Sequence, residues 1–345
     1  MKKSISLLMV LFVILLLVAC SNDENNDKSE VDSTEEAASN EELTKMKVAY
    51  MPNYASMNAV VAGINTGAFE EQGIEVELVE FADGPTIIAA MESGSIDVGY
   101  IGPGAHVLAI QGSADIFAFA HLGNADEVIG NKENGVREIS DLKGKTIAVA
   151  SGTSSETILN MTLNEAGLTE EDVKLMDMDA SAIVTAMISG SVDAAATWSP
   201  NTTAIKEEMG DNAIMLSNNV RYADQFPSIA SWVVNPKYAE ENHDLLVKFT
   251  KGLYGGMDYR VENLDEVAKW SAEVAGLDAE SVKKETGDGD WITSDDLVEM
   301  IENGDIDIFY EVQQENFMTE ERLTEDELVP VSDYVLFDIM KEAAE

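Results

Sequence analysis

The chain has 345 residues, of which 65 are Asp or Glu and 21 are Lys or Arg, so its formal net charge is −44 at pH 7. Such an excess of negative charge excludes nucleic acid and anionic membrane surfaces as binding partners. We interpret the charge as a solvated surface suited to a salty or alkaline medium; the alternative is a field that favours cationic ligands. The single cysteine leaves no internal disulfide, so the fold depends on its hydrophobic core.

The first residues have the pattern of an export signal. Two lysines precede the apolar run 7–18, which is short for a transmembrane helix. The run ends in Leu-Val-Ala-Cys at 17–20, which resembles the lipobox of bacterial lipoproteins. This resemblance implies cleavage of the signal peptide 1–19 and a lipid on Cys20; the alternative is an uncleaved anchor with an unused cysteine. Residues 20–44 are polar, acidic and free of aromatic side chains, which predicts a disordered tether.

Strands and helices alternate along the next part of the chain. Strands are predicted at 45–51, 74–81, 96–101 and 116–122, with helices at about 56–67, from Pro85 onward and at 106–111. The order recurs after a crossover at 127–140, with strands at 141–150, 173–178, 192–198 and 213–216 and helices near 156–166 and 202–209. Such alternation implies mostly parallel sheets flanked by helices. A returning strand is predicted at 228–234, and helices follow at 236–262, 264–275, 278–286, 294–303, 305–317 and 332–344.

One stretch occurs twice and suggests the domain organisation. IIAAMESGSID at 87–97 and IVTAMISGSVD at 183–193 are identical at seven of eleven positions. Each copy reads as an apolar helix, a glycine that ends it in the left-handed conformation, and a short strand. A period of this length is typical of two related domains; the alternative is a chance likeness between two common units. We therefore predict an α/β fold of two lobes, 46–125 plus 232–345 and 126–231, with a ligand cleft between them.

Several segments share their order and spacing with a known family. They are KVAYMPN, FEEQGIEVELVEFADG, GSIDVGYIGPG, HLGN, ISDLKGKTIAVASGTSSET, GSVDAAATWSPN and SWVVNPKYAEEN, and the resemblance covers about residues 46–320. With these segments in this order and spacing, the chain resembles the taurine, aliphatic sulfonate and nitrate group of solute-binding proteins of ABC importers. The resemblance implies a type II periplasmic-binding-protein fold, with two crossover strands, that closes over a small ligand. With the lipobox it implies a monomeric receptor on the outer face of the cell membrane, as in Gram-positive bacteria, with an ABC permease as partner.

The loop SGTSSET at 151–157 is a candidate anion site because it joins a predicted buried strand to the start of a helix. Free backbone N–H groups, hydroxyls and the helix dipole converge at such a position. The ordinary alternative is N-capping of the helix. The candidate residues are Gly152, Thr153, Ser154 and Ser155.

Glu156 departs from the family pattern, which has a histidine or a neutral residue at this point of the loop. A carboxylate here opposes a bare anion, so it either meets a cationic group of the ligand or is a favourable charge in the first helical turn. The taurine branch has an acid two residues before the tryptophan that matches Trp232. This chain has Ala230 there, so the amine of taurine lacks the partner that the resemblance implies.

Other candidate contacts lie at predicted strand ends and loops. In open α/β sheets such positions face the ligand crevice. Aromatic rings there pack on apolar ligand parts or surround a cation, and glycine permits close approach of the backbone; packing in the core is the alternative. These candidates are Asn53, Tyr54, Gly84, Tyr100, Gly102, Pro103, His121, Trp198 and Trp232.

No catalytic or metal-binding motif occurs in the sequence, and three histidines with one cysteine make no zinc set. Asp288-Gly289-Asp290 resembles half of a calcium loop whose ligands do not continue, which favours a surface turn. We therefore predict a receptor without cofactor or enzymatic activity, whose ligand is a small sulfonate such as taurine or an alkanesulfonate. The alternatives are a receptor for a pyrimidine or thiamine precursor or a betaine-like cation, and a sensory receptor for a membrane kinase.

Overall fold

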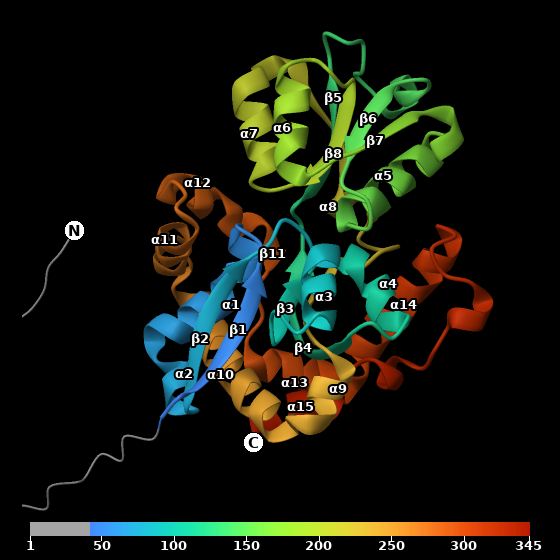
Figure 1. Cartoon of the computed structure of the whole chain (residues 1–345). Coiled ribbons are helices and arrows are strands. Elements are labelled where there is room, and N and C mark those ends of the chain that lie inside the picture. Colours follow the sequence, from blue (N-terminus) through green and yellow to red (C-terminus); the bar gives the residue numbers. More distant parts are fainter. Residues whose placement is uncertain (1–41) are drawn as a thin grey trace, which may run out of the picture. The chain divides into compact units, whose positions relative to one another are not determined.

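The computed structural model describes residues 42–345, which form two α/β lobes that are each built on one mixed sheet (Figure 1). The predicted signal peptide 1–19, the lipidation of Cys20 and the tether up to residue 41 lie outside the described residues. None of the helices between residues 42 and 345 combines the length and the apolar character that crossing a bilayer requires.

The first lobe begins with the predicted alternation of strands and helices. Its elements are β1 (Thr44–Tyr50), α1 (Tyr54–Thr66), α2 (Ala68–Glu71), β2 (Ile74–Glu80), α3 (Gly84–Glu92), β3 (Val98–Ile101), α4 (His106–Ile110) and β4 (Asp115–Gly123). β1 lies between β2 and β3 and runs parallel to both. The carboxyl ends of these strands therefore lie at one edge of the sheet.

The second lobe repeats this order of strands and helices, and it begins with β5, the strand by which the chain enters it. Its elements are β5 (Asp126–Asn131), β6 (Thr146–Val149), α5 (Ser154–Glu165), β7 (Lys174–Asp177), α6 (Ala180–Ile188), β8 (Ala194–Trp198), α7 (Asn201–Met209), β9 (Ala213–Asn218) and α8 (Asn219–Tyr222). β8 is buried along its whole length because helices cover both faces of the sheet (Figure 1). Ala195 packs in one core cluster with Ile183 of α6, whereas Ala196 packs with Ile158 of α5 in another.

The chain then returns to the first lobe and completes it. The elements of this part are β10 (Ile229–Val234), α9 (Pro236–Glu241), α10 (His243–Glu262), α11 (Leu264–Ala275), α12 (Ala279–Lys284), β11 (Gly289–Asp290), α13 (Ser294–Asn303), α14 (Asp305–Thr319) and α15 (Phe337–Ala344). The predicted helix 236–262 is interrupted at Asn242, whose backbone is not helical (φ −133°, ψ 31°). The predicted turn at Asp288 leads instead into the short strand β11, which pairs with β4.

Each sheet takes in the first strand that follows a crossing of the chain between the lobes. β5 enters the second sheet antiparallel, in the order β7-β6-β8-β5-β9, and β10 enters the first sheet antiparallel, in the order β11-β4-β10-β3-β1-β2. These strands are the two crossovers, and the predicted two-lobed α/β class is confirmed. β5 lies at the start of the segment 127–140, which the sequence predicts as a crossover. β10 lies wholly in the first sheet, whereas the predicted lobe boundary between 231 and 232 falls inside it.

The sequence repeat corresponds to a structural repeat. After α3 and α6, Gly94 and Gly190 take the left-handed conformation with φ of 72° and 70°. The aspartates that end the two copies also act alike: Asp97 Oδ2 accepts a hydrogen bond from the backbone N–H of Lys47 at 2.7 Å, and Asp193 Oδ2 accepts one from the N–H of Thr146 at 2.9 Å. Each aspartate thereby fixes the repeated helix–strand unit to the first parallel strand of its own sheet.

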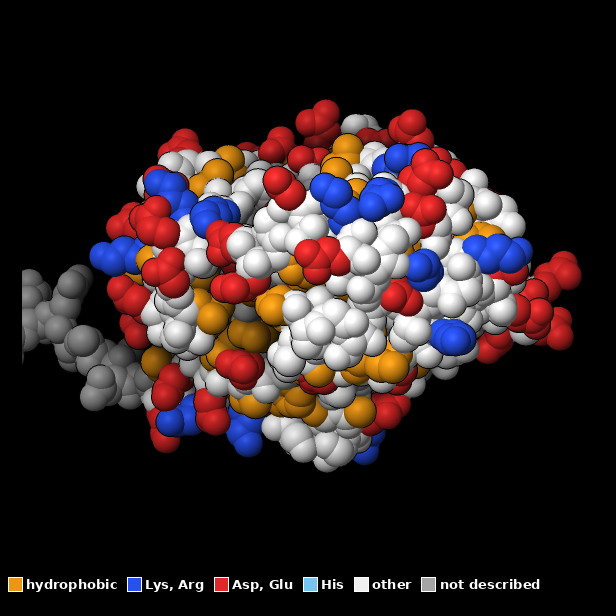
Figure 2. Space-filling model, turned by 90° about the horizontal axis from the view of Figure 1, so that it is seen from above, with side chains coloured by type: hydrophobic (Ala, Val, Ile, Leu, Met, Phe, Trp, Pro, Cys, Tyr) orange, Lys and Arg blue, Asp and Glu red, His pale blue; other side chains and the backbone are white. Residues whose placement is uncertain are grey.

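Acidic side chains are spread over the surface rather than gathered in one patch on the face that Figure 2 shows, with Lys and Arg side chains among them. This distribution agrees with the interpretation of the net charge as a solvated surface.

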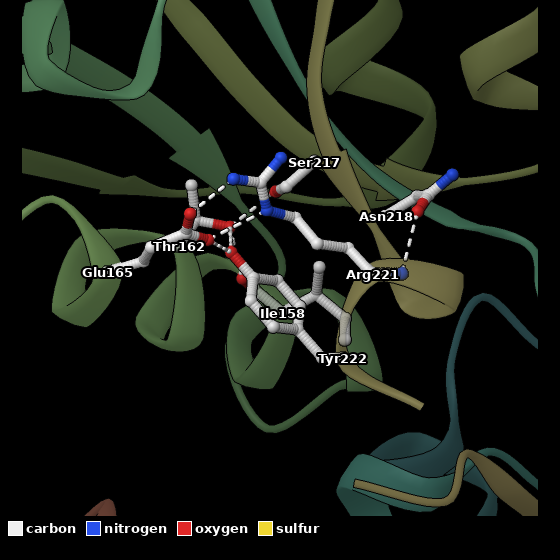
Figure 3. A network of polar contacts seen from close by, with 7 residues as sticks. All are labelled: Ile158, Thr162, Glu165, Ser217, Asn218, Arg221 and Tyr222. Carbon is white, nitrogen blue, oxygen red and sulfur yellow. Dashed lines mark hydrogen bonds and ion pairs between the residues drawn. The ribbon is translucent and has the colours of Figure 1, made fainter. Parts of the chain in front are cut away.

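A polar network holds the end of the second lobe in place before the chain crosses back (Figure 3). Arg221 of α8 donates through Nε to Glu165 of α5 at 2.7 Å, and the hydroxyl of Tyr222 donates to the same carboxylate at 2.9 Å. The hydroxyl of Thr162 in α5 also bonds that of Ser217 in β9. These contacts fix the start of the second connection between the lobes.

Candidate functional site

A cleft lies between the lobes, and residues of both lobes line it. Its walls come from the carboxyl ends of β1, β3, β4 and β8 and from the first residues of α1, α3 and α5. The C-terminal part contributes two acidic residues, Glu285 and Asp288. The cleft therefore lies where open α/β sheets bind their ligands.

The lobes are in direct contact beside the cleft. Gly104, in the turn after β3, packs so closely on the second lobe that a Cβ atom would lie 2.1 Å from the carbonyl carbon of Thr153. On α5, the hydroxyl of Thr157 donates to Glu320 Oε2 and accepts from Arg322 Nη1, both at 3.3 Å. These contacts define a closed arrangement of the lobes.

The hydroxyls at the start of α5 are engaged by the protein itself. Thr153 Oγ1 donates to the carbonyl of Ala150 at 2.7 Å, and Ser154 Oγ donates to Asp126 Oδ1 at 2.9 Å. Ser155 Oγ donates to the same oxygen of Asp126. A carboxylate of the chain therefore lies at the position where the sequence analysis expects the anion of a ligand.

Glu156 acts as a cap within its own loop, since its Oε2 accepts a hydrogen bond from the N–H of Gly152 at 2.8 Å and Glu156 does not line the cleft. We expect Glu156→Gln to lower the free energy of unfolding by about 0.5–1 kcal/mol, the size of a capping or helix-dipole contribution. Ligand affinity should change less than about twofold, to be measured by titration calorimetry beside a urea melt. A tenfold loss of affinity with unchanged stability would instead show that Glu156 contacts the ligand.

Asp126, at the start of β5, is a buried carboxylate held by neutral donors. Besides the two serine hydroxyls, Asn219 Nδ2 donates to its Oδ2 at 3.1 Å. Asn219 Oδ1 in turn accepts from the backbone N–H of Asp126. Burial raises the pKa of Asp126, and the hydrogen bonds from Ser155, Asn219 and Ser154 oppose this shift. The side chain is thus fixed in the cleft wall without a cationic partner among its hydrogen-bond donors.

Two further carboxylates come from the segment after α12. Glu285 Oε2 accepts a hydrogen bond from the backbone N–H of Tyr54 at 2.8 Å, at the start of α1. Burial raises the pKa of Glu285 to about 7 and that of Asp288 to about 6. Glu285 Oε1 and Asp288 Oδ2 are buried and have no hydrogen-bond partner among the described residues.

Aromatic rings form another part of the wall. Tyr100 of β3 stacks on His121 of β4, with ring centres 5.9 Å apart and planes 12° apart. Burial, and to a lesser degree the nearby Arg260, hold the pKa of His121 well below its usual value, so the imidazole is neutral. Trp198, the last residue of β8, adds an indole from the second lobe.

The structure brings together nine of the fourteen predicted ligand contacts in the cleft: Asn53, Gly84, Tyr100, Gly102, Pro103, His121, Thr153, Ser154 and Trp198. Tyr54 packs edge-on against Trp291 with ring centres 5.3 Å apart, and Trp232 packs on Tyr100 and Phe249; both are core residues behind the wall. Gly152, Ser155 and Glu156 also do not line the cleft.

The sequence did not lead us to predict the three carboxylates of the cleft, Asp126, Glu285 and Asp288. Asp288 belongs to the Asp-Gly-Asp stretch that the sequence favours as a surface turn, and Asp126 follows the HLGN segment directly. Glu285 carries no local signal, since it meets Tyr54 across 231 positions of the chain. In the part of the chain that the structure describes, no group of three or more His, Cys, Asp or Glu side chains is arranged to hold a metal ion.

The fold and the cleft define a two-lobed solute-binding protein of the periplasmic-binding-protein type. In the alkanesulfonate-binding protein SsuA of Xanthomonas axonopodis pv. citri, solved bound to MOPS, the same fold occurs with a TM-score of 0.66 at 20% identity, over 86% of this chain and 99% of that one. Residues 55–267, more than half of the chain, match the model of the NMT1/THI5 like family. The chain belongs to this family.

Two relatives agree with this assignment. A protein of Brucella abortus (strain 2308) named as a binding protein is 30% identical over 79% of this chain and 85% of its own length. A protein of Bacillus subtilis (strain 168) named as an aliphatic sulfonates-binding protein is 30% identical over 67% of this chain and 70% of its own. The predicted membership in the taurine and aliphatic sulfonate group is thereby confirmed, and these relatives are named as binding proteins rather than enzymes.

Proposed function

We propose that the protein is the extracytoplasmic solute receptor of an ABC importer, which captures a small organic molecule between its lobes and delivers it to a permease. The observation that carries the proposal is the cleft itself, whose walls come from both lobes at the carboxyl ends of their strands. The names of the relatives support the same role, as does the absence of a catalytic motif from the sequence.

The receptor acts as a monomer whose closure is coupled to binding. A ligand in the cleft contacts Tyr100 and His121 of the first lobe together with Ser154 and Trp198 of the second. A molecule that touches both lobes binds the closed arrangement better than an open one, so it shifts the population toward closure. The permease then recognises the closed form; presentation to a membrane kinase instead is the sensory alternative.

The family and the lining of the cleft point to different classes of ligand. The family suggests an organosulfonate, which is the ligand predicted from the sequence. The lining, however, contains three carboxylates and neither Lys nor Arg, which favours the alternative of a cationic ligand. A pyrimidine or thiamine precursor is an intermediate case, because a flat heterocycle can use the aromatic wall.

A ligand screen by thermal shift tests the receptor role on the purified protein. The panel contains sulfonates, nitrate, amines, betaines, pyrimidines and thiamine precursors, since a ligand that binds only the folded state raises the melting temperature by mass action. We expect at least one class to raise it, with a decrease of the radius of gyration in small-angle scattering as the lobes close. A protein that no member of the panel stabilises or compacts would not be a receptor for such solutes.

We also propose that a lipid on Cys20 holds the receptor at the outer face of the cell membrane. Cys20→Ser should abolish labelling of the protein by radioactive palmitate, because it removes the thiol that carries the lipid. Labelling and fractionation of cells that express either form provide the measurement. A wild-type protein that takes up no label and still stays in the membrane fraction would point to an uncleaved apolar segment 7–18 as the anchor.

A further inference from the structure

The cleft combines acidic side chains with an absence of basic ones. Asp126 comes from the second lobe, Glu285 and Asp288 come from the first, and no Lys or Arg lines the cleft. The imidazole of His121 is neutral because burial and Arg260 hold its pKa well below the usual value. An anionic ligand would therefore lie beside three acids without contact to a positive side chain, which disfavours its charged form.

Unpartnered oxygens indicate the hydrogen-bonding character of the ligand. Glu285 is only 2% exposed, and its Oε1 accepts no hydrogen bond from any described residue. Oδ2 of Asp288 is a buried atom that also accepts no hydrogen bond from any described residue, while Asp288 as a whole is half-buried and the hydroxyl of Ser199 bonds its carboxylate. A buried acceptor without a donor is unfavourable, so a ligand that supplies N–H groups to both oxygens gains hydrogen bonds that a quaternary ammonium cannot make.

The rest of the wall suits an apolar body. Trp198 and Tyr100 offer aromatic surface, and Met51, Pro85 and Ala230 add aliphatic surface. Aromatic faces also attract a cation that lies over them. A ligand with a charged nitrogen at one end and an apolar body at the other matches both parts of the cleft.

We propose that the cleft binds a small organic cation whose nitrogen donates hydrogen bonds to Glu285 and Asp288 of the first lobe and faces Asp126 of the second. This inference rests on the receptor function proposed above and names its ligand class. Without a ligand, the carboxylates of the two lobes repel each other as the lobes approach. A cation between them removes this repulsion, so its charge itself favours the closed state.

The pH dependence of binding has a sign that separates cations from anions. Burial raises the pKa of Glu285 to about 7 and that of Asp288 to about 6, and a cation binds their ionised forms. Affinity for a cation should therefore rise between pH 5.5 and pH 8, on the order of tenfold, whereas affinity for a sulfonate should fall. The charged groups that act on the two carboxylates are each other, Asp126, Glu127 and Lys206. Tyr54 donates its backbone N–H to Glu285, and Tyr100 and His121 line the same cleft.

A matched series of probes tests the inference by thermal shift and titration calorimetry on the purified protein, in EDTA. Benzylamine, hexylamine and benzamidine are cations with N–H donors. Benzyltrimethylammonium has the same body as benzylamine and the same charge without donors, and phenylmethanesulfonate has the same body with an anion. We expect the first three to bind, the sulfonate and taurine not to bind, and the quaternary probe to bind at least about tenfold more weakly than benzylamine.

Three variants assign the effect to the cleft. Glu285→Gln and Asp288→Asn should each weaken benzylamine binding at pH 8 by on the order of tenfold or more and flatten the pH profile. The control Asp290→Asn removes an exposed carboxylate two residues from Asp288 that does not line the cleft, and it should leave the affinity unchanged. Ligand-free melting curves show whether each variant folds. If one of the two cleft variants does not fold, the other still tests the inference.

The outcomes separate this inference from the receptor role. Binding of a sulfonate or a neutral pyrimidine, with no binding of any amine, overturns the cation inference but keeps the receptor. Equal affinity for benzylamine and its trimethyl analogue overturns the assigned hydrogen bonds. If Mg²⁺ or Ca²⁺ alone stabilises the protein in a run without EDTA, the proposal that the cation is organic is overturned. If nothing in either panel binds, both proposals fail.

Discussion

Replacing Gly104 with valine should weaken binding of every ligand, whatever its charge, on the order of a hundredfold, while the protein remains folded. A Cβ at this position would lie 2.1 Å from the carbonyl carbon and 2.4 Å from the carbonyl oxygen of Thr153, and 2.3 Å from the nitrogen of Ser154. These are backbone atoms of the other lobe, so no side-chain rotation relieves the overlap and the lobes stop short of the closed arrangement. Affinity falls with the fraction of molecules that can close.

The measurement for Gly104→Val is titration calorimetry, with small-angle scattering to follow closure. Gly104 does not have the left-handed backbone that would restrict it to glycine, so the ligand-free melting temperature should change by only a few degrees. Gly287→Ala is the matched control, because its added Cβ meets nothing within 4 Å. A Gly104→Val protein that binds and compacts like the control would show that this contact does not limit closure.

The sequence repeat predicted the fold well because the features that define it lie close together in the sequence. The eleven repeated residues hold the end of an apolar helix and a left-handed glycine, with a strand directly after them, and Gly94 and Gly190 adopt the predicted conformation. What these short-range signals do not show is where β5 and β10 insert, each between two strands of its sheet; crossover strands were expected only from the family resemblance. The neighbours that a strand takes in a sheet depend on long-range pairing that local alternation does not record.

The candidate site was predictable where it depends on strand ends. Tyr100, His121 and Trp198 lie at or near the ends of strands, and topology alone brings such ends to one crevice. The carboxylates are different, because their role arises from tertiary contacts. Ser154 and Ser155 read as capping residues or anion donors in the sequence, and only the folded chain shows that they donate to Asp126.

Arg260→Leu should lower the free energy of unfolding by about 3–5 kcal/mol, the size expected when donors are removed from several buried acceptors. Arg260 of α10 is fully buried. Its guanidinium donates to Asn58 Oδ1 of α1, to the carbonyl of Ala120 in β4 at 3.3 Å and to the carbonyl of Ile292 at 3.1 Å. It also lies 5.3 Å over the ring of Trp291. Leucine fills part of the space but leaves all three oxygens without this donor.

The leucine variant also removes the cost of keeping a charge in the core, which is why the expected loss is smaller than the sum of three unmade hydrogen bonds. Burial lowers the pKa of Arg260 to about 10, so the wild-type guanidinium is charged at neutral pH. Chemical denaturation at pH 7 measures the difference, with Arg137→Leu at an exposed position as the control, expected within about 0.5 kcal/mol of wild type. If both variants lose the same small amount, the guanidinium does not tie α1, β4 and α10 together, and the wall behind His121 must owe its rigidity to the packing of Trp291 and Tyr54.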